Sequence, residues 1–553
     1  MRTEMLHACA GIALAALAFV HNESAAGAGG ASTGAPLPAT RPELSEFRET
    51  SSLEDVRGFL SALLTRGAPF AVERLGLSTH GRESPLVIVS HPPVANASDA
   101  RRAGKLVIYL QANIHGGEVE GKEAAQVLLR EFAAGEHRAL LEHLVLLITP
   151  VYNCDGNENL APGLKARAHQ NGPDPIGARA NGQDLDLNRD CMKARTPEMQ
   201  AALAAIYCAW DPDAVIDLHT TNGTRHGYAL TYSPPLCPGG DRAVLEYTRD
   251  RLLVQVRQRM RTAHGLETFD YGNVEQQDGR RAWYTFGAEP RYVTNYAGVR
   301  GRIGVLSEAT SFLPFETRIT ATRAFVLEVL RYLAEHAVEV ATLTRGADAR
   351  ATQWGLGSGA TAGEPPPELG LRFDHALRGR EPVLLERADL DPQPPPHAPP
   401  GALESVELDI YDRFMSTHSR TYPAAYFIPA TLRAVVDLLL AHGVVVEELE
   451  APWVGAIERF QVRESVASDR PFQGARLVRL EGTYKSSEQT IPAGSFLVRT
   501  AQPLGVLTFH LLEPESLDGA SAWGFFDRVP AGGEYPLTRS HTPPKVATHR
   551  VPR

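Results

Sequence analysis

The pattern of apolar and polar positions is regular from residue 43 to about residue 341, and a different pattern follows beyond that point. From Glu43 to Ala341, short apolar runs typical of buried strands alternate with longer amphipathic segments typical of helices. This alternation predicts an α/β fold in which helices pack on a sheet. We expect strands at Leu106–Leu110, Leu144–Thr149, Ala214–Leu218 and Gly304–Ser307, and helices at Gly121–Ala134 and Ala321–Val338.

The last third of the chain follows a different pattern. Two Pro/Gly-rich stretches, 355–367 and 389–400, predict a linker or long loops, because proline-dense backbone cannot enter the interior of a helix or sheet. Beyond Glu404 we expect a smaller α+β or β-rich domain. Its predicted helix is Ala430–His442, ended by Gly443, and its predicted strands are Gly443–Glu447, Ala475–Leu480 and Ser495–Arg499.

The sequence of the N-terminus indicates the cellular compartment in which the protein acts. The stretch from Ala8 to Val20 is uncharged and rich in Ala and Leu, and it is too short to span a bilayer as a helix. Ala26-Gly27-Ala28 fits a cleavage site of the small-x-small type. We therefore expect a signal peptide over residues 1–28 and a secreted or periplasmic protein, the alternative being an irregular cytoplasmic N-terminus.

Composition narrows the class of protein. A chain of 553 residues with 43% hydrophobic and 22% charged side chains has room for more than one globular domain. Its net charge of −10 supplies no basic surface for nucleic acid, and no apolar run has the length needed for stable membrane insertion. Five cysteines are too few for a disulfide scaffold, and their pairing is left open.

The first candidate for chemistry is His115-Gly116-Gly117-Glu118, which follows the predicted strand Leu106–Leu110. Imidazole nitrogen and carboxylate oxygen are both ordinary zinc ligands, and a tight Gly-Gly turn lets both reach one ion. Taken alone, such a pair is more often an incidental surface or core pair.

The second candidate is Asp217-Leu218-His219, directly after the apolar residues 214–216. A histidine at the carboxyl end of a strand faces the crevice in which open α/β sheets bind ligands. His219 could therefore complete a site of two histidines and one carboxylate with an open fourth position. Taken alone, a hydrogen-bonded histidine at the rim of the core is the favoured interpretation.

Two further motifs carry charged groups. In Asp184-Leu185-Asp186-Leu187-Asn188-Arg189, the guanidinium offers a fork for a carboxylate, and Asp186 could orient a ligating imidazole. Ser307-Glu308 ends an apolar run, where a carboxylate could activate a zinc-bound water and later protonate a leaving amine. A solvated turn and a strand-ending glutamate are the alternatives when each is taken singly.

The order, spacing and context of the four motifs together resemble the zinc carboxypeptidase family, the carboxypeptidase A/B-like metallopeptidases, from about residue 43 to residue 341. The resemblance implies an open mixed sheet flanked by helices and one Zn²⁺ per chain. The site residues that it implies are His115, Glu118 and His219 as zinc ligands, Glu308 as general base, and Asn188 and Arg189 as the holders of the terminal carboxylate of a peptide.

The same resemblance implies an arginine that polarises the scissile carbonyl and a mobile tyrosine. Arg167 is our candidate for the arginine, and Tyr296 for the tyrosine with Tyr292 as its alternative. Asp190 departs from the family pattern, which puts the neighbouring pocket chemistry in doubt. The sequence leaves the preferred terminal side chain open among basic, acidic and apolar residues.

The sequence therefore predicts a zinc metallocarboxypeptidase that acts on peptides with a free C-terminus. We expect a catalytic domain at 43–345, a linker or loops at 346–403 and an accessory domain at 404–553. Two rival hypotheses are a zinc-dependent deacylase of the aspartoacylase type, acting on N-acyl amino acids, and a non-catalytic binding protein on a degenerate peptidase fold. Glu513 and Glu515 are expected in a solvated loop, because no other candidate group converges on them.

Overall fold

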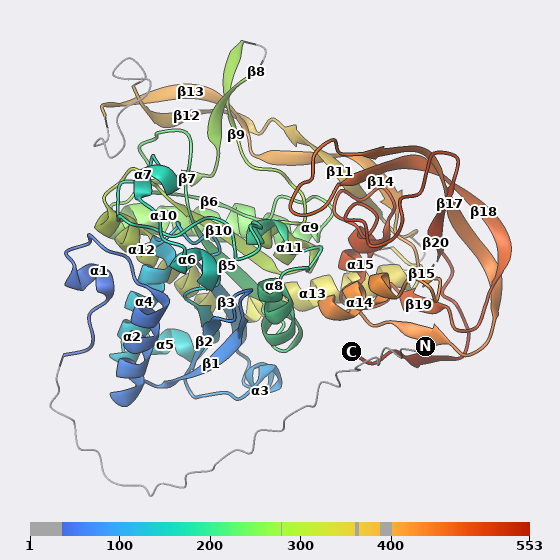
Figure 1. Ribbon diagram of the computed structural model, residues 1–553, viewed down its shortest axis with the longest axis horizontal. Coiled ribbons are helices and arrows are strands. Elements are labelled where there is room, and N and C mark those ends of the chain that lie inside the picture. Colours follow the sequence, from blue (N-terminus) through green and yellow to red (C-terminus); the bar gives the residue numbers. More distant parts are fainter. Residues whose placement is uncertain (1–35, 278, 360–363, 388–400) are drawn as a thin grey trace, which may run out of the picture. The chain divides into compact units, whose positions relative to one another are not determined.

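The computed structural model describes residues 36–277, 279–359, 364–387 and 401–553 (Figure 1). The predicted signal peptide at 1–28 and the whole of the second Pro-rich stretch, 389–400, lie outside these residues. Residues Leu37–Arg553 form a single unit by their internal contacts, and this unit holds every helix and strand of the described ranges. No helix within the described ranges is long and apolar enough to cross a membrane.

An eight-stranded sheet organises the first part of the chain, in the order β1-β2-β4-β3-β5-β10-β6-β7. The strands β4, β3, β5 and β10 run parallel, whereas β2 and β6 pair with them antiparallel. The predicted open mixed sheet is therefore confirmed. Its strands are β1 Phe70–Leu77, β2 Glu83–Ser90, β3 Leu106–Ala112, β4 Leu144–Thr149, β5 Ala214–Thr220, β6 Leu230–Ser233, β7 Thr268–Asp270 and β10 Ile303–Ala309.

Helices flank this sheet and alternate with its strands along the sequence. The longest are α12 and α13, and α12 packs on α4 and α10. The helices of this part are α1 Arg41–Leu44, α2 Leu53–Thr65, α3 Ala97–Arg102, α4 Glu120–Ala133, α5 Arg138–Leu141, α6 Cys154–Glu158, α7 Gly163–Ala166, α8 Pro197–Ala202, α9 Arg242–Tyr247, α10 Leu253–His264, α11 Val293–Val299, α12 Phe315–Glu335 and α13 Ala337–Gly355.

The central strands are buried on both faces, which explains why they appear in the sequence as continuous apolar runs. Successive side chains of a strand point to opposite faces, so β3 contributes to two cores. Ile108 packs with residues of α2, α4 and α12. Tyr109 belongs to the other core, which also holds Tyr296 of α11 and Val435 from the last third of the chain. The C-terminal region therefore shares a hydrophobic core with the sheet.

Much of the segment predicted to be a linker or loops, 346–403, has regular structure. It contains the end of α13 and the strands β11 Glu368–Ala376 and β12 Gly379–Glu386. Pro382 fits in β12 because this strand lies at the edge of the sheet β12-β13-β9-β8, where a missing N–H costs no ladder hydrogen bond. The other members are β8 Asn273–Gln277, β9 Arg280–Tyr284 and β13 Leu403–Tyr411. The domain limits themselves stay a prediction.

The remainder of the chain is rich in β-structure, as its pattern predicted. A seven-stranded sheet has the order β18-β17-β20-β15-β19-β16-β21, and β14 pairs with β11. The elements are β14 Arg413–Thr421, β15 Ala425–Ile428, α14 Arg433–His442, β16 Glu447–Leu449, β17 Trp453–Ala467, β18 Val478–Ile491, β19 Phe496–Arg499, α15 Gly505–Leu512, β20 Glu534–Ser540 and β21 Thr548–Arg550.

Two local expectations in this region are corrected. The strand expected at Gly443–Glu447 begins only at Glu447, because Gly443 adopts a left-handed conformation (φ 93°) that caps α14 and turns the chain. The expected solvated loop holds two buried carboxylates instead. Glu513 accepts hydrogen bonds from the Tyr426 hydroxyl at 2.7 Å and from Arg539 at 2.8 Å, which offset its burial.

Candidate metal centre and active site

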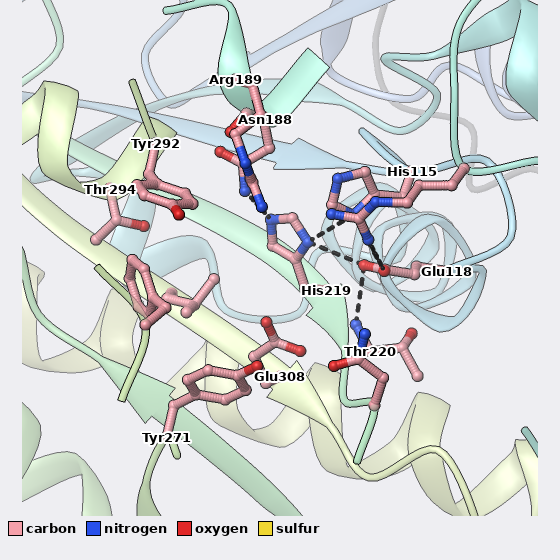
Figure 2. Close-up of a pocket in the computed structure, with 14 residues that line it drawn as sticks. His115, Glu118, Asn188, Arg189, His219, Thr220, Tyr271, Tyr292, Thr294 and Glu308 are labelled. Atoms are coloured by element: carbon pink, nitrogen blue, oxygen red, sulfur yellow. Dashed lines mark hydrogen bonds and ion pairs between the residues drawn. The ribbon is translucent and has the colours of Figure 1, made fainter. Parts of the chain in front are cut away.

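The four sequence motifs meet at one edge of the eight-stranded sheet. His115 and Glu118 follow β3, His219 lies in β5, and Glu308 lies in β10. These three strands are neighbours and parallel, so their carboxyl ends come together. Glu308 and His219 are paired in register across β10 and β5, and Figure 2 shows both side chains at the same pocket.

The turn between β3 and α4 depends on its glycines. A Cβ added at Gly116 would lie 2.2 Å from the carbonyl carbon of Gly156, and one added at Gly177 would lie 2.6 Å from the oxygen of Gly116. Three backbone segments are therefore in close contact here. The Asn113 side chain donates hydrogen bonds to the carbonyls of His115 and Gly116, both at 3.2 Å, which fix the turn.

His115, Glu118 and His219 are buried and converge on one point (Figure 2). The Nδ1 atoms of the two histidines are 3.2 Å apart. Nδ1 of His115 lies 3.0 Å from Oε1 of Glu118, and Nδ1 of His219 lies 2.9 Å from Oε2 of the same carboxylate. One ligand atom from each of these three residues can therefore reach a single metal ion.

Each imidazole has a carboxylate at its outer nitrogen. Nε2 of His115 lies 3.0 Å from Asp186, and Nε2 of His219 lies 2.7 Å from Asp217. Burial alone would raise the pKa of Asp186, but the neighbouring His115 and Arg179 hold this pKa well below its usual range. An ionised carboxylate at Nε2 keeps the proton there and leaves the Nδ1 lone pair free for a metal.

This donor set fits zinc. Two Nδ1 lone pairs that face each other at 3.2 Å need a cation or a shared proton between them, and the Glu118 carboxylate adds a negative charge. Two histidines and one carboxylate, with the fourth position open to solvent, are the ligands of catalytic zinc sites. The Arg167 guanidinium, 2.8 Å from Oε1 of Glu118, helps to hold the pKa of this buried carboxyl well below its usual range.

A cavity of about 130 Å³ opens beside the ligand group. Its walls combine charged, amide and aromatic side chains, drawn in Figure 2. The lining residues are His115, Glu118, Arg179, Asn188, Arg189, His219, Thr220, Asn222, Tyr271, Phe286, Tyr292, Thr294, Leu306 and Glu308. Burial, with the Glu118 carboxylate adding to it, raises the pKa of Glu308 to about 8, towards the range in which a carboxyl group can both accept and return a proton near neutral pH.

Asn188 and Arg189, the pair expected to hold a terminal carboxylate and called the carboxylate clamp below, lie on a 3₁₀ turn at Leu187–Arg189. Oδ1 of Asn188 accepts a hydrogen bond from the backbone N–H of Val293 at 2.9 Å. The Arg189 guanidinium lies over the Tyr292 ring, 4.3 Å from its centroid, and donates to the Asn188 carbonyl at 2.7 Å. The clamp is therefore held between its own turn and the start of α11.

The arginine nominated from the sequence does not line the pocket. Arg167 is engaged by Glu118 and by the carbonyls of Thr220 and Thr221, each at 2.9 Å. Arg179 lines the pocket instead, and it bonds Asp186 at 2.8 Å. Sequence reasoning missed Arg179 because the glycine contacts that draw its segment onto the His115 turn join distant parts of the chain.

The nominated tyrosine also lies away from the pocket. Tyr296 is fully buried, and its hydroxyl is 2.7 Å from Nδ1 of His442 on α14. The alternative, Tyr292, lines the pocket, as does Tyr271, which the sequence did not single out. Asp190 faces inward to Thr196 and Lys193, so it contributes no group to the pocket.

Asp217 is the other residue that the motifs left without a role. It stands two positions before His219 in a strand, so both side chains point to the same face. The Asp-x-His spacing within a predicted strand was the sequence signal that could have identified Asp217 as the partner of His219. Cys154, Cys191, Cys208 and Cys237 are free, and the first of these is buried with a raised thiol pKa, as expected of a packed residue.

A group of two histidines and one glutamate at the edge of an open sheet, faced by a buried carboxylate and two arginines, fits the class of zinc-dependent hydrolases, which includes the peptidases. The sequence model of the family described as zinc carboxypeptidase matches residues 63–320. Over these residues the chain carries a zinc carboxypeptidase domain of that metallopeptidase family.

Similar proteins bear related names. Carboxypeptidase 2 of Trichophyton rubrum is 24% identical over 513 residues, 88% of this chain and 86% of that protein. Carboxypeptidase 2 of Trichophyton equinum is 23% identical with the same coverage. A metallo-carboxypeptidase structure from Pseudomonas aeruginosa is 19% identical, covers 53% of this chain and 70% of its own, and has a TM-score of 0.39. The family match favours the carboxypeptidase over the deacylase and the non-catalytic hypotheses.

Proposed function

We propose that this protein removes the C-terminal residue of peptides, with one Zn²⁺ held by His115, Glu118 and His219. The observation that carries the proposal is the presence, in one cavity, of the ligand group, the Glu308 carboxyl and the clamp arginine Arg189. A free peptide C-terminus carries a carboxylate next to the scissile bond, so a cationic fork beside the metal ligands suits this substrate.

When bound, zinc supplies a Lewis acid that polarises the scissile carbonyl and makes water more acidic. Glu308 accepts the proton of the attacking water on its carboxylate and returns it to the leaving amine. Arg179 stabilises the negative charge that develops on the carbonyl oxygen, the role first expected of Arg167. Asn188 and Arg189 fix the register of the peptide through its terminal carboxylate.

The cavity walls bear on the preference for the terminal side chain. Phe286, Tyr292 and Leu306 are aromatic or apolar, and the two arginines Arg179 and Arg189 share the cavity with them. We expect apolar terminal residues to be released faster than Lys or Arg, because a cationic side chain would meet like charge.

The test is a panel of peptides that differ only in the last residue, each with a free and an amidated C-terminus, assayed with and without a chelator. The zinc content of the purified protein is measured in parallel. We expect one zinc per chain, loss of activity on chelation, and release of the last residue from the free forms only. Equal cleavage of the amidated peptides would refute the carboxylate clamp.

We further propose that the protein is exported, which residues 8–20 and the Ala26-Gly27-Ala28 site support. N-terminal sequencing of the protein from its native host tests this. A mature chain that begins near residue 29 is the expected result, and an intact Met1 in the cell interior would contradict it.

A further inference from the structure

The C-terminal region contacts the pocket walls from outside, at the two segments that carry the carboxylate clamp and Tyr292. The first contact comes from the turn between β17 and β18. There the side-chain oxygen of Gln473 accepts a hydrogen bond from the backbone N–H of Asp186 at 2.7 Å. These two residues are 287 positions apart in the sequence, yet the bond lies two positions from Asn188.

The conformation of this turn sets Gln473 apart. Phe472 and Ala475 exchange backbone hydrogen bonds of 2.7 and 3.0 Å, and the two residues between them have positive φ angles, 49° at Gln473 and 78° at Gly474. A two-residue turn with both φ angles positive favours Asn or Gly at its first position. Gln is an unusual choice there, and its longer side chain is the one that reaches Asp186.

The turn holds the segment around Asp186, which contacts both His115 and Asn188. Asp186 orients His115 through its side chain, and its Oδ1 accepts the backbone N–H of Asn188 at 2.9 Å. The neighbouring N–H of Leu185 is bound within the segment, by Asn181 at 3.0 Å. The N–H of Asp186 is bound by Gln473. The C-terminal region thus supplies one of the bonds that fix the backbone leading into the clamp.

The second contact fixes the backbone before Tyr292. The buried Asp518 carboxylate accepts the backbone N–H of Arg291 at 2.9 Å and lies 2.9 Å from its side-chain Nε. The Trp523 indole donates to the same carboxylate at 3.1 Å. Because the ring of Tyr292 lies under the Arg189 guanidinium, this contact positions the other side of the clamp.

The two contacts belong to one surface. The ring of Phe472, next to Gln473, stacks with that of Trp523 at 6.2 Å between centroids. The Arg291 guanidinium lies 5.3 Å from each ring centroid. A displacement of the β17–β18 turn would therefore act on both sides of the clamp together.

We propose that Gln473 and Asp518 are positioning residues for substrate binding, through which the C-terminal region sets the geometry of Asn188, Arg189 and Tyr292. The C-terminal region is then part of the binding apparatus for the peptide's terminal carboxylate. This proposal rests on the proposed carboxypeptidase function.

The test uses the full-length zinc-loaded enzyme with a free-carboxylate peptide. Gln473→Met keeps the length of the side chain but removes the acceptor, and Gln473→Asn suits the turn but is one methylene too short. For both we expect KM to rise about 3–10-fold, the equivalent of one neutral hydrogen bond, with kcat within about twofold. Zinc content stays at the wild-type value, because no metal ligand is altered, and the melting temperature falls by no more than about 2 °C, the shift that one lost hydrogen bond causes in a large chain.

Two controls separate positioning from a structural role. Gln489→Met removes an acceptor of Arg459 within the same β17–β18 hairpin and is expected to leave KM unchanged. In an Arg189→Met background, Gln473→Met is expected to add less than about twofold, since both changes act on the same interaction with the substrate. An Asp518→Asn variant should raise KM too, but its burial makes stability loss part of its effect.

An unchanged KM in a folded Gln473→Asn or Gln473→Met protein would overturn the proposal, as would full additivity with Arg189→Met. So would a fall in zinc affinity without a change in KM, because the turn would then support only His115. A wild-type enzyme that releases no C-terminal residue defeats the proposed function and this inference with it. Normal wild-type activity with indifferent Gln473 variants defeats this inference alone.

Discussion

The imidazoles of His115 and His219, the proposed zinc ligands, are each fixed by a different carboxylate, and the two carboxylates come from different elements. Asp217 lies on the same strand as His219, whereas Asp186 reaches His115 from the loop that also carries the clamp. A histidine whose Nε2–H is bound presents Nδ1 as its only lone pair. Under the proposed function, the loop of Asp186 therefore links the proposed zinc ligand His115 to the proposed substrate-binding residue Asn188 through single hydrogen bonds.

At this scale the general base gives the first prediction. Glu308→Gln keeps the shape of the side chain but removes its capacity to accept a proton, so we expect kcat to fall by about 10²–10⁴-fold. Zinc should remain at one per chain, because Glu308 is outside the ligand group. The measurement is steady-state kinetics with metal analysis. Near-normal turnover in the zinc-loaded variant would remove Glu308 from the role of base.

The two arginines give the second prediction. Arg179→Met should lower kcat by about 10²-fold, as the loss of one donor to a developing oxyanion does. Arg167→Met should act mainly on zinc, with an affinity about 10–100-fold weaker, because Arg167 orients the Glu118 ligand. Kinetics at saturating zinc and a zinc titration distinguish the two. If Arg167→Met lowered kcat with zinc bound and Arg179→Met did not, Arg167 would be the arginine that stabilises the oxyanion, as first expected from the sequence.

At the scale of elements, paired charges stabilise the sheet of the C-terminal region. Glu513 joins β15 and β20 through Tyr426 and Arg539, and Glu458 joins β17 to the end of β20 through Arg539 and His541. These bonds cross between strands that are distant in the sequence. They explain how strands with many polar positions form an ordered sheet.

Glu458 makes this contribution dependent on pH. Its hydrogen bond to His541, with the Arg539 charge, lowers its pKa to about 2. A depressed carboxyl pKa stabilises the fold above the unfolded value, near 4.5, and this stability is lost as pH falls towards 2.

We expect Glu458→Gln to lower the free energy of unfolding at pH 7 by about 1–2 kcal/mol, allowing for solvent screening. The variant should also lose less stability than the wild type between pH 4.5 and pH 2. Urea denaturation at several pH values measures both effects. Glu488→Gln, at an exposed position of β18, is the matched control. Parallel pH profiles for Glu458→Gln and the wild type would contradict the prediction.

At the scale of the whole molecule, the eight-stranded sheet and the C-terminal region share a core. Tyr109 of β3 and Val435 of α14 belong to one buried cluster, and Tyr296 of α11 bonds His442 of α14. The sheet and α11 are therefore held in part by residues of the C-terminal region.

We expect a chain ended at residue 403 to fail as a soluble folded protein, because it would expose the side of this core that α14 covers. Expression yield, circular dichroism and zinc binding, compared with the full chain, are the measurements. A truncated protein that melts cooperatively at the temperature of the full chain and binds zinc would show that the catalytic part folds alone.

The sequence by itself determined which candidate residues gather at the site and the sheet that presents them. His115, Glu118, His219 and Glu308 follow or end apolar runs, and parallel strands bring such positions to one edge whatever the loops do. Only the tertiary structure decided which arginine and which tyrosine face the pocket, and that Glu513 is buried. These features depend on contacts such as Gly116 with Gly177 or Gln473 with Asp186. Such contacts join segments that are distant in the sequence, and neither segment's local sequence indicates which other segment it will contact.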